Sequence, residues 1–435
     1  MNGEAHSSQK EENVMDDWSC VACTLKNRGS SNTCECCSTS RTHDKNSWLC
    51  VHCTYLNTSS VLMCDMCKYA RELPRIQSKS QIKYQDEKKV TKRQKLRWPP
   101  GNMYRPEAWR ELPICQIGDV HTCKQLLAEH GVVIFRNVLN ADEIQVARDL
   151  FWQWFETHTP ARRTKPSTLT SAVAQSCGHA NTGVTTNFCI GQSEFLWYCR
   201  LKAVPAWRTV WDCEDLVSSF DGCGLWRNPY LFSDAFTHGR WYHLDQNVRE
   251  NAHFLGYQGL VQISDTATDE TGSLVVIPGS HKDFRANCER GNKLLNRGSF
   301  VRLSTPADLA YCDQHAVQCA PLYPGDIVVW DSRVVHCSAS VCRNLPSTHS
   351  LRGGRTFFSS KFSDNEISPP MLARLVAYVA MMPRSHVSSR VATNRRNAVL
   401  QGYGSGWNSL IVRRSPAPPK NFSPPHFDHP LWSLV

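Results

Sequence analysis

The stretch WYHLDQN, residues 241–247, contains two residue types that bind transition metals. His243 stands two positions before Asp245 inside an apolar and aromatic run. In a β-strand, side chains two positions apart point to the same face. The imidazole and the carboxylate would then lie side by side, either as a surface ion pair or as two ligands of one metal ion. A metal site requires at least one further ligand.

His336 is the best candidate for that ligand among the 17 histidines, because it follows a predicted strand in GDIVVWDSRVVHCS. Two histidines and one carboxylate on one face of an iron ion form the facial triad of non-haem Fe(II) oxygenases. Arg355 begins another predicted strand, and its guanidinium could hold the carboxylate of a cosubstrate. A zinc hydrolase with the same three ligands is an alternative interpretation.

Short apolar runs bounded by Gly, Pro and Ser predict the strands that position these residues. They are Val132–Phe135 and the runs GYQGLVQIS, GSLVVIPGS and GDIVVWDS. Strands of this length and spacing are typical of a sandwich or a barrel-like jelly roll. Two further apolar runs lie near Phe357 and Leu372, and we expect the second of them to be helical.

A helix is predicted over residues 141–158, where apolar side chains recur at helical spacing along one face. Asn140 and Glu143 before and within its first turn form the pattern of a capping box. We expect this helix to belong to the core and not to a binding site.

Four segments together resemble the phytanoyl-CoA dioxygenase family of Fe(II)/2-oxoglutarate oxygenases. They are WYHLDQN, QGLVQISDTATDETGSLVVIPGSHKDF, PGDIVVWDSRVVHCS and RTFFSSKF, and DLVSSFDG upstream is also similar. The resemblance spans roughly residues 125–365. It implies a mainly β fold with a double-stranded β-helix (jelly-roll) core and flanking helices. It also places the iron ligands on His243, Asp245 and His336.

The same resemblance places the residues that hold 2-oxoglutarate on Ser338 and Arg355. Arg355 follows His336 by 19 residues, which is longer than is usual in the family and indicates a loop insertion. Arg352 is therefore the alternative clamp, and Arg343 a weaker one. Asp245 implies hydroxylation or a related oxidation, since halogenating relatives lack this carboxylate.

Several other polar residues lie close to these motifs in the sequence. His281, in PGSHKDF, is expected to shape a turn near the site and not to bind metal. Asp331 and Arg333 are expected to pair with each other. Gln246 and Asn247 could face either substrate or solvent. The twelve cysteines after residue 100 show no ligand spacing, so we expect free thiols.

The N-terminal region contains the same unit twice, as DDWSCVACTLKNRGSSNTCECC and, 30 residues later, NSWLCVHCTYLNTSSVLMCDMC. Each unit has the spacing C-x2-C-x10-C-x2-C, which presents four thiolates to a structural zinc ion. Segments this short cannot build a core, so the metal must supply their folding free energy. The expected ligands of the two zinc ions are Cys20, Cys23, Cys34 and Cys37, and Cys50, Cys53, Cys64 and Cys67.

Both units resemble the RanBP2-type zinc finger, in a zinc-ribbon-like form. One branch of that family binds single-stranded RNA through basic residues that these units lack. The ubiquitin-binding branch has a pattern that the second unit matches at Thr54, Tyr55 and Met66, whereas the first has Cys36 in place of the methionine. The resemblance implies ubiquitin as a partner, with RNA less favoured and a purely scaffolding role as the alternative.

Charge and composition divide the chain into fingers at residues 14–42 and 43–72, a basic linker at 73–101 and an oxygenase-like domain at 102–435. Between residues 71 and 97, ten Lys and Arg face three acids, within a net charge of +10 for the chain. A solvated linker, a nuclear import signal and a polyanion patch are all compatible with that run.

We expect an intracellular protein of the cytoplasm, the nucleus or both. The N-terminal residues are polar and acidic and lack the features of a signal peptide. The longest apolar run, MLARLVAYVAMM, is too short to span a membrane and contains Arg374.

The sequence therefore predicts a hydroxylase that depends on Fe(II) and 2-oxoglutarate and carries two zinc fingers. The alternative is an inactive oxygenase fold that acts as a ubiquitin- or RNA-binding adaptor. The residues that would select the substrate lie in loops, and the sequence does not identify it.

Overall fold

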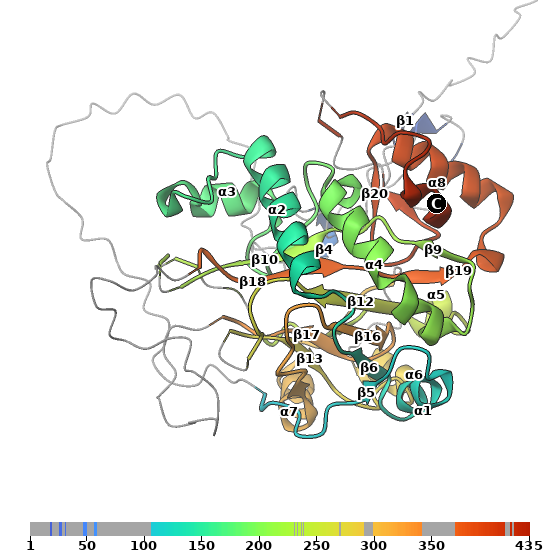
Figure 1. Cartoon of the computed structure of the whole chain (residues 1–435). Helices are drawn as coiled ribbons and strands as arrows, with labels where there is room; N and C mark the ends of the chain where they lie inside the picture. The colour runs from blue at the N-terminus through green and yellow to red at the C-terminus, as the bar shows by residue number, and fades with distance from the viewer. Residues whose placement is uncertain are drawn as a thin grey trace, which may run out of the picture. The chain divides into compact units, whose positions relative to one another are not determined.

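The computed structural model describes most of the chain from residue 106 onward (Figure 1). The exceptions after that point are residues 230, 233, 236, 238, 269–270, 291–298, 342–369, 414–417 and 420–421. Before residue 106 it describes Ser31 and four short strands. The chain divides into two units, Met1–Leu96 and Arg97–Val435, and each is considered by itself.

The four N-terminal strands form two hairpins, β1 (Trp18–Ser19) with β2 (Lys26–Asn27) and β3 (Ser47–Leu49) with β4 (Leu56–Thr58). Trp18 lies opposite Asn27, and Trp48 lies opposite Asn57. The sequence repeat is thus also a repeat in strand register. The eight predicted zinc ligands and the predicted ubiquitin contacts lie outside the described residues, as does the predicted basic linker at 73–101.

The larger sheet of the second unit has eight strands and provides one wall of a barrel-like core. Their spatial order is β5 (Ile114–Cys115), β6 (Val132–Phe135), β16 (Ile327–Asp331), β12 (Tyr257–Gln262), β18 (Leu372–Tyr378), β10 (Cys223–Arg227), β8 (Val184–Thr185) and β7 (Gly178–His179).

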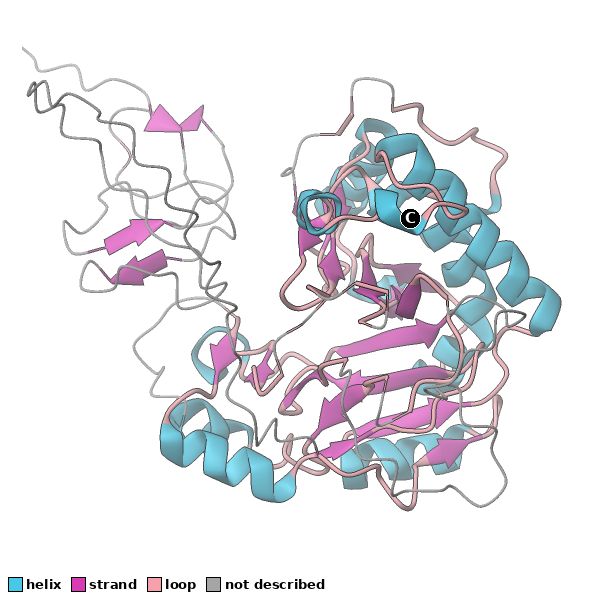
Figure 2. Ribbon diagram, turned by 90° about the vertical axis from the view of Figure 1, so that its left-hand side faces the viewer, coloured by secondary structure: helices cyan, strands magenta, loops and turns pink. Residues whose placement is uncertain are grey.

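The smaller sheet has five strands and provides the opposite wall. Their order is β14 (Val301–Arg302), β11 (His243–Leu244), β17 (His336–Ser338), β13 (Leu274–Val276) and β15 (Val317–Gln318). From β10 to β18 the chain passes repeatedly between the two sheets. Adjacent strands in this part of the core pair antiparallel, namely β10 with β18, β18 with β12, β12 with β16, β11 with β17, and β17 with β13. This arrangement agrees with the predicted jelly-roll core (Figure 2).

The described helices lie outside this core and cover it. They are α1 (Val120–His130), α2 (Ala141–His158), α3 (Ser171–Ser176), α4 (Glu194–Trp211), α5 (Val248–Asn251), α6 (Phe284–Arg290), α7 (Pro306–His315) and α8 (Ser389–Gln401). Helices α2 and α4 cover the outer face of the larger sheet and share one apolar cluster with it (Figure 1). None of the described helices is long and apolar enough to cross a membrane.

The prediction for residues 141–158 is confirmed by α2. Asn140 and Glu143 form a reciprocal capping box, because each side chain accepts a hydrogen bond from the backbone of the other, at 3.0 and 2.9 Å. The apolar stripe from Ile144 to Phe155 is buried against the sheet. The four predicted strand runs also form strands, as β6, β12, β13 and β16.

The prediction of a helix near Leu372 is wrong, because residues 372–378 form strand β18. The strand lies between β10 and β12 and is buried on both faces. Leu375 belongs to the apolar cluster that the sheet shares with α2 and α4, whereas Val376 belongs to the cluster inside the barrel. A strand that is covered on both faces is continuously apolar, so the period of its apolar residues cannot distinguish it from a buried helix.

A C-terminal layer completes the domain beside α4. It comprises α8, the hairpin β20 (Gly404–Ser405) and β21 (Val412–Arg413), the pair β9 (Leu216–Ser218) and β19 (Met381–Pro383), and the short helices η2 (Ile190–Gln192), η3 (Arg384–His386) and η4 (Pro430–Leu434). The short helix η1 (Pro166–Thr168) lies between α2 and α3 along the chain. Arg395 of α8 connects three segments of this layer, because its guanidinium donates hydrogen bonds to the carbonyls of Ser218, Ser409 and Leu434.

Candidate metal centre

Two neighbouring strands of the smaller sheet hold the two predicted histidine ligands. His243 in β11 lies directly opposite His336 in β17. Their ring centroids are 4.2 Å apart, with an angle of 47° between the ring planes. Both side chains are almost completely buried. Residues that are 93 positions apart in the sequence thus become a cross-strand pair.

The carboxylate of Asp245 completes the cluster immediately after β11. Its Oδ2 atom lies 3.3 Å from Nε2 of His336 and 3.7 Å from Nε2 of His243. One ligand atom from each of the three residues lies within 4.8 Å of the others. Three atoms at this spacing can bind one ion on one face, so the structure brings the predicted triad together.

Backbone hydrogen bonds orient both imidazole rings toward the carboxylate. Nδ1 of His243 lies 3.0 Å from the carbonyl oxygen of Trp241, and Nδ1 of His336 lies 3.0 Å from that of Val334. A carbonyl only accepts, so each Nδ1 carries the proton and each Nε2 presents a lone pair. This second hydrogen bond is what holds a metal-binding histidine in the correct tautomer and orientation.

The protonation states of the cluster also suit a cation. Burial and the proximity of His336 lower the pKa of His243, and these effects outweigh the opposing attraction of Asp245. For Asp245, burial acts to raise the pKa, but the proximity of His243 and His336 outweighs it and holds the pKa well below its usual range. A neutral imidazole and an ionised carboxylate are the forms that bind metals.

Aromatic side chains enclose the histidines. The rings of Trp241 and Phe300 stack on His243, with centroids at 4.7 and 4.8 Å. Trp330 lies against His336 at 5.4 Å. These rings limit the access of water to the histidine side of the cluster, while Asp245 keeps about 19% of its side chain exposed. The His2Asp donor set fits Fe(II), and one face of the ion would remain open.

Arg374 is a candidate site residue that our sequence interpretation did not identify. It lies in β18 on the same face as Val376, and its guanidinium lies over the ring of Trp226 at 4.4 Å. Val376, Trp226 and Trp330 belong to one apolar cluster inside the barrel. Arg374 therefore points into the interior that also contains the histidines.

The charge of Arg374 has no partner in the described part of the chain. The side chain is 0% exposed, yet none of its three guanidinium nitrogens makes a hydrogen bond there. Burial lowers the pKa of Arg374 to about 10, so the group keeps its charge at neutral pH. An unpaired buried charge is costly unless a ligand compensates it. A bidentate guanidinium fits a carboxylate.

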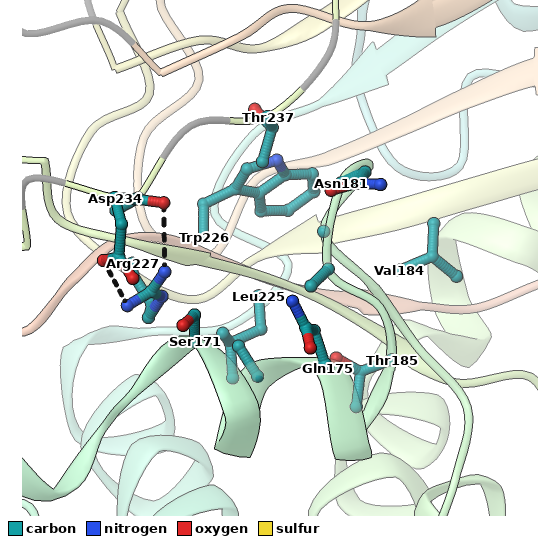
Figure 3. Close-up of a pocket in the computed structure, with 14 residues that line it drawn as sticks. Ser171, Gln175, Asn181, Val184, Thr185, Leu225, Trp226, Arg227, Asp234 and Thr237 are labelled. Carbon is teal, nitrogen blue, oxygen red and sulfur yellow. Dashed lines mark hydrogen bonds and ion pairs between the residues drawn. The ribbon is translucent and has the colours of Figure 1, made fainter. Parts of the chain in front are cut away.

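A polar hollow of about 60 Å³ lies beside Trp226, between α3, β8, β10 and the segment after β10 (Figure 3). Arg227 and Asp234 form an ion pair of 2.9 Å at its rim. Trp226 and Thr237 line it. Nε1 of Trp226 and Oγ1 of Thr237 are buried and have no hydrogen-bond partner among the described residues. No triad residue lines this hollow, but Trp226, which lines it, also contacts the guanidinium of Arg374.

The structure also places the other residues near the motifs. Ser338 is buried in β17, two positions after His336 and therefore on the same face. Asp331 and Arg333 form the expected ion pair through two side-chain hydrogen bonds. His281 has the expected structural role, because its Nε2 lies 3.3 Å from the carbonyl oxygen of Ala128 at the end of α1.

Gln246 and Asn247, whose exposure the sequence left open, are buried. Gln246 donates to the carbonyl of Phe254, and Asn247 caps α5 by accepting from the backbone of Arg249. The described cysteines after residue 100 are free thiols, as expected. Arg355, Arg352 and Arg343 lie outside the described residues.

Comparison with protein families finds a match in the core of the second unit. Residues 127–341 match the model of the phytanoyl-CoA dioxygenase (PhyH) family. This segment includes the complete triad and Ser338, and it ends before Arg374. The match supports an Fe(II)/2-oxoglutarate oxygenase-type fold. No curated protein sequence matched the chain.

Solved structures show only distant likeness. GlcNAc Inducible Gene 2, GIG2 (DUF1479), from Candida albicans is 13% identical with a TM-score of 0.42, covering 72% of this chain and 82% of its own. HygX from Streptomyces hygroscopicus, solved with nickel and 2-oxoglutarate, is 14% identical with a TM-score of 0.35, covering 60% and 87%. EctD from S. alaskensis, solved with 2-oxoglutarate and 5-hydroxyectoine, is 14% identical with a TM-score of 0.32, covering 66% and 86%. At these scores the neighbours do not determine the activity of this chain.

Proposed function

We propose that the chain is an Fe(II)- and 2-oxoglutarate-dependent oxygenase that hydroxylates its substrate, because the segment that matches the PhyH family model contains a complete His2Asp cluster. The cluster of His243, Asp245 and His336 carries this proposal. With each Nδ1 held by a backbone carbonyl, both Nε2 atoms face the carboxylate, and one ligand atom from each residue lies within 4.8 Å of the others. In enzymes of this kind, the metal and the oxoacid together activate dioxygen, and the oxoacid is decarboxylated to succinate.

We further propose that Arg374 binds the distal carboxylate of 2-oxoglutarate. Its guanidinium is buried, charged and without a described partner, and it points into the barrel. A carboxylate would satisfy this charge with two parallel hydrogen bonds. Ser338, on the same strand face as His336, is proposed as a second contact. Arg355 was the clamp predicted from the sequence and stays the alternative.

The protein would thus bind both cosubstrate and metal in an enclosed interior. The histidines and Asp245 hold the ion, and Arg374 orients the oxoacid toward it. The aromatic rings of Trp241, Phe300 and Trp330 exclude water from the histidine side. Exclusion of water strengthens each of these electrostatic contacts.

Turnover of 2-oxoglutarate tests the proposed activity without knowledge of the substrate. Purified full-length protein with Fe(II) should convert 2-oxoglutarate to succinate slowly. His243→Ala, Asp245→Ala and His336→Ala should each abolish this conversion. His315→Ala, at the exposed end of α7, serves as the control and should retain it. Full succinate production by all three triad variants would contradict the proposal.

The same experiment distinguishes the proposed oxygenase from the two other interpretations of the fold. An inactive adaptor would produce no succinate in the wild-type protein. A zinc hydrolase would bind zinc at the triad but would not consume 2-oxoglutarate. The charge of Arg374 favours the oxygenase over the hydrolase, because it supplies a site for an oxoacid.

For the N-terminal unit we propose two structural zinc ions and weak binding of ubiquitin by the second finger. The shared register of Trp18 with Asn27 and of Trp48 with Asn57 supports two copies of one module. Metal analysis of the full chain should give two zinc ions, and one after Cys50→Ser. Loss of ubiquitin binding after Tyr55→Ala would support the predicted contact, whereas salt-resistant RNA binding without ubiquitin binding would contradict it.

A further inference from the structure

Gln258 is a buried side chain that reaches the cluster from the larger sheet. It lies in β12 opposite Trp330 of β16. Its amide nitrogen, Nε2, lies 2.7 Å from Oδ2 of Asp245. An ionised carboxylate only accepts hydrogen bonds, so the amide nitrogen must be the group that faces it.

The oxygen that Gln258 contacts is the one that faces both histidines. Oδ2 of Asp245 lies 3.3 Å from Nε2 of His336 and 3.7 Å from Nε2 of His243. Neighbouring ligand atoms around an octahedral ion are about 3 Å apart, given metal–ligand distances of roughly 2.1 Å. Oδ2 is therefore placed to bind the ion. A carboxylate oxygen has two lone pairs, so it can accept from Gln258 at the same time.

We infer that Gln258 is a positioning residue that makes Asp245 bind the metal through one oxygen only. The inference rests on the proposed function. If the carboxylate rotated to place both oxygens on the ion, the hydrogen bond from Gln258 would be distorted or lost. A hydrogen bond to a charged group is stronger than one between neutral groups, so it favours a single orientation of the carboxylate.

Single-oxygen binding matters for the number of open positions on the metal. Three protein ligand atoms leave three positions on an octahedral ion, which is the number that a chelating oxoacid and dioxygen together need. A second oxygen from Asp245 would occupy one of them. Gln258 thus preserves the open face on which the proposed reaction depends.

Gln262 provides a matched control on the same strand. It is four residues further along β12, on the same face, and completely buried. Its amide donates to Oγ of Ser264 and to the carbonyl of Asp265, at 3.0 and 2.7 Å, and not to the triad. A substitution there removes an equivalent buried amide without affecting Asp245.

The test compares Gln258→Met with Gln262→Met in the full-length protein. Methionine has a similar length to glutamine but cannot donate a hydrogen bond. Mn(II) is the probe, because the thiolates of the predicted zinc modules compete poorly for this hard ion. The loss of the signal of free Mn(II) in electron paramagnetic resonance gives the affinity, and the line shape of bound Mn(II) reports the ligand set.

We expect Gln258→Met to weaken Mn(II) binding by about 10- to 100-fold, as is usual when a hydrogen bond to a metal ligand is removed. It should also change the line shape. Gln262→Met should change the affinity less than about twofold. Equal binding by wild type and Gln258→Met, with an unchanged line shape, would overturn the inference alone. Failure of the wild type to bind Mn(II), or retention of binding by His336→Ala, would overturn the proposed metal site as well.

Discussion

Two parts of the domain bury an arginine completely, and they differ in whether the guanidinium has hydrogen-bond partners among the described residues. In the C-terminal layer, Arg395 donates to three backbone carbonyls. Beside it, Arg200 of α4 donates to the carbonyls of Gly191 and Asp221. Inside the barrel, Arg374 is equally buried but has no hydrogen-bond partner among the described residues.

This difference separates a structural role from a binding role. The carbonyls around Arg395 belong to segments that the side chain holds together, so its charge is compensated within the fold. For Arg374, compensation from Trp226 is limited to a cation–π contact. A buried charge without a partner among the described residues is destabilising unless a ligand compensates it, and its retention is explained if a ligand uses it.

The largest effect on folding should follow removal of the satisfied arginine. Arg395→Met leaves three buried carbonyls without a donor, and we expect a loss of about 3 kcal/mol in the free energy of unfolding. Urea denaturation followed by tryptophan fluorescence measures this. Arg396→Met is the control, because Arg396 is exposed on the same helix and stacks on Phe427 and Trp432; its effect should be below about 1 kcal/mol. Similar losses in both variants would contradict the structural role of Arg395.

Removal of the unpaired arginine should leave folding almost unchanged. Arg374→Met replaces a buried charge by an apolar side chain in an apolar cluster, so the free energy of unfolding should change by less than about 1 kcal/mol or increase. The same urea experiment, in the absence of metal and oxoacid, gives the value. A loss as large as that in Arg395→Met would show that Arg374 has structural partners and would remove the contrast.

A smaller effect is expected at Trp226, which supports the guanidinium. Trp226→Phe keeps an aromatic face beneath Arg374 but weakens the cation–π contact, by about 0.5–1 kcal/mol. The dissociation constant of 2-oxoglutarate should then rise by about two- to fivefold. Isothermal titration of Mn(II)-loaded protein measures it. An unchanged constant would show that Trp226 does not orient Arg374.

The contrast also explains what the sequence could reveal. His243 and Asp245 were recognisable from their H-x-D spacing, although β11 ends at Leu244 and Asp245 lies in the bend after it, and the family motif identifies the third ligand. Asn140 and Glu143 were predictable because a capping box is local. These signals depend on short stretches of chain or on a recognised motif order.

Arg374 was not predictable by counting residues from His336. The next described strand of the core after β17 is β18, and residues 342–369, which the structure does not describe, lie between the two. A single charge inside the apolar run MLARLVAYVAMM was the available signal, but it indicated only that this run does not span a membrane. Gln258 carried no signal at all, because only the pairing of β12 with β16 and the position of Asp245 bring it to the cluster.

Titration of 2-oxoglutarate into the Mn(II)-loaded protein tests the central claim most directly. The variants are Arg374→Met and Arg355→Ala, the clamp predicted from the sequence. Loss of a charge-assisted bidentate contact should cost about 2–3 kcal/mol, so Arg374→Met should raise the dissociation constant by roughly 30- to 150-fold while Mn(II) stays bound. Arg355→Ala should change it by less than about threefold. If Arg355→Ala instead produces the large loss and Arg374→Met binds 2-oxoglutarate like the wild type, the unpaired charge in the barrel is not the oxoacid site.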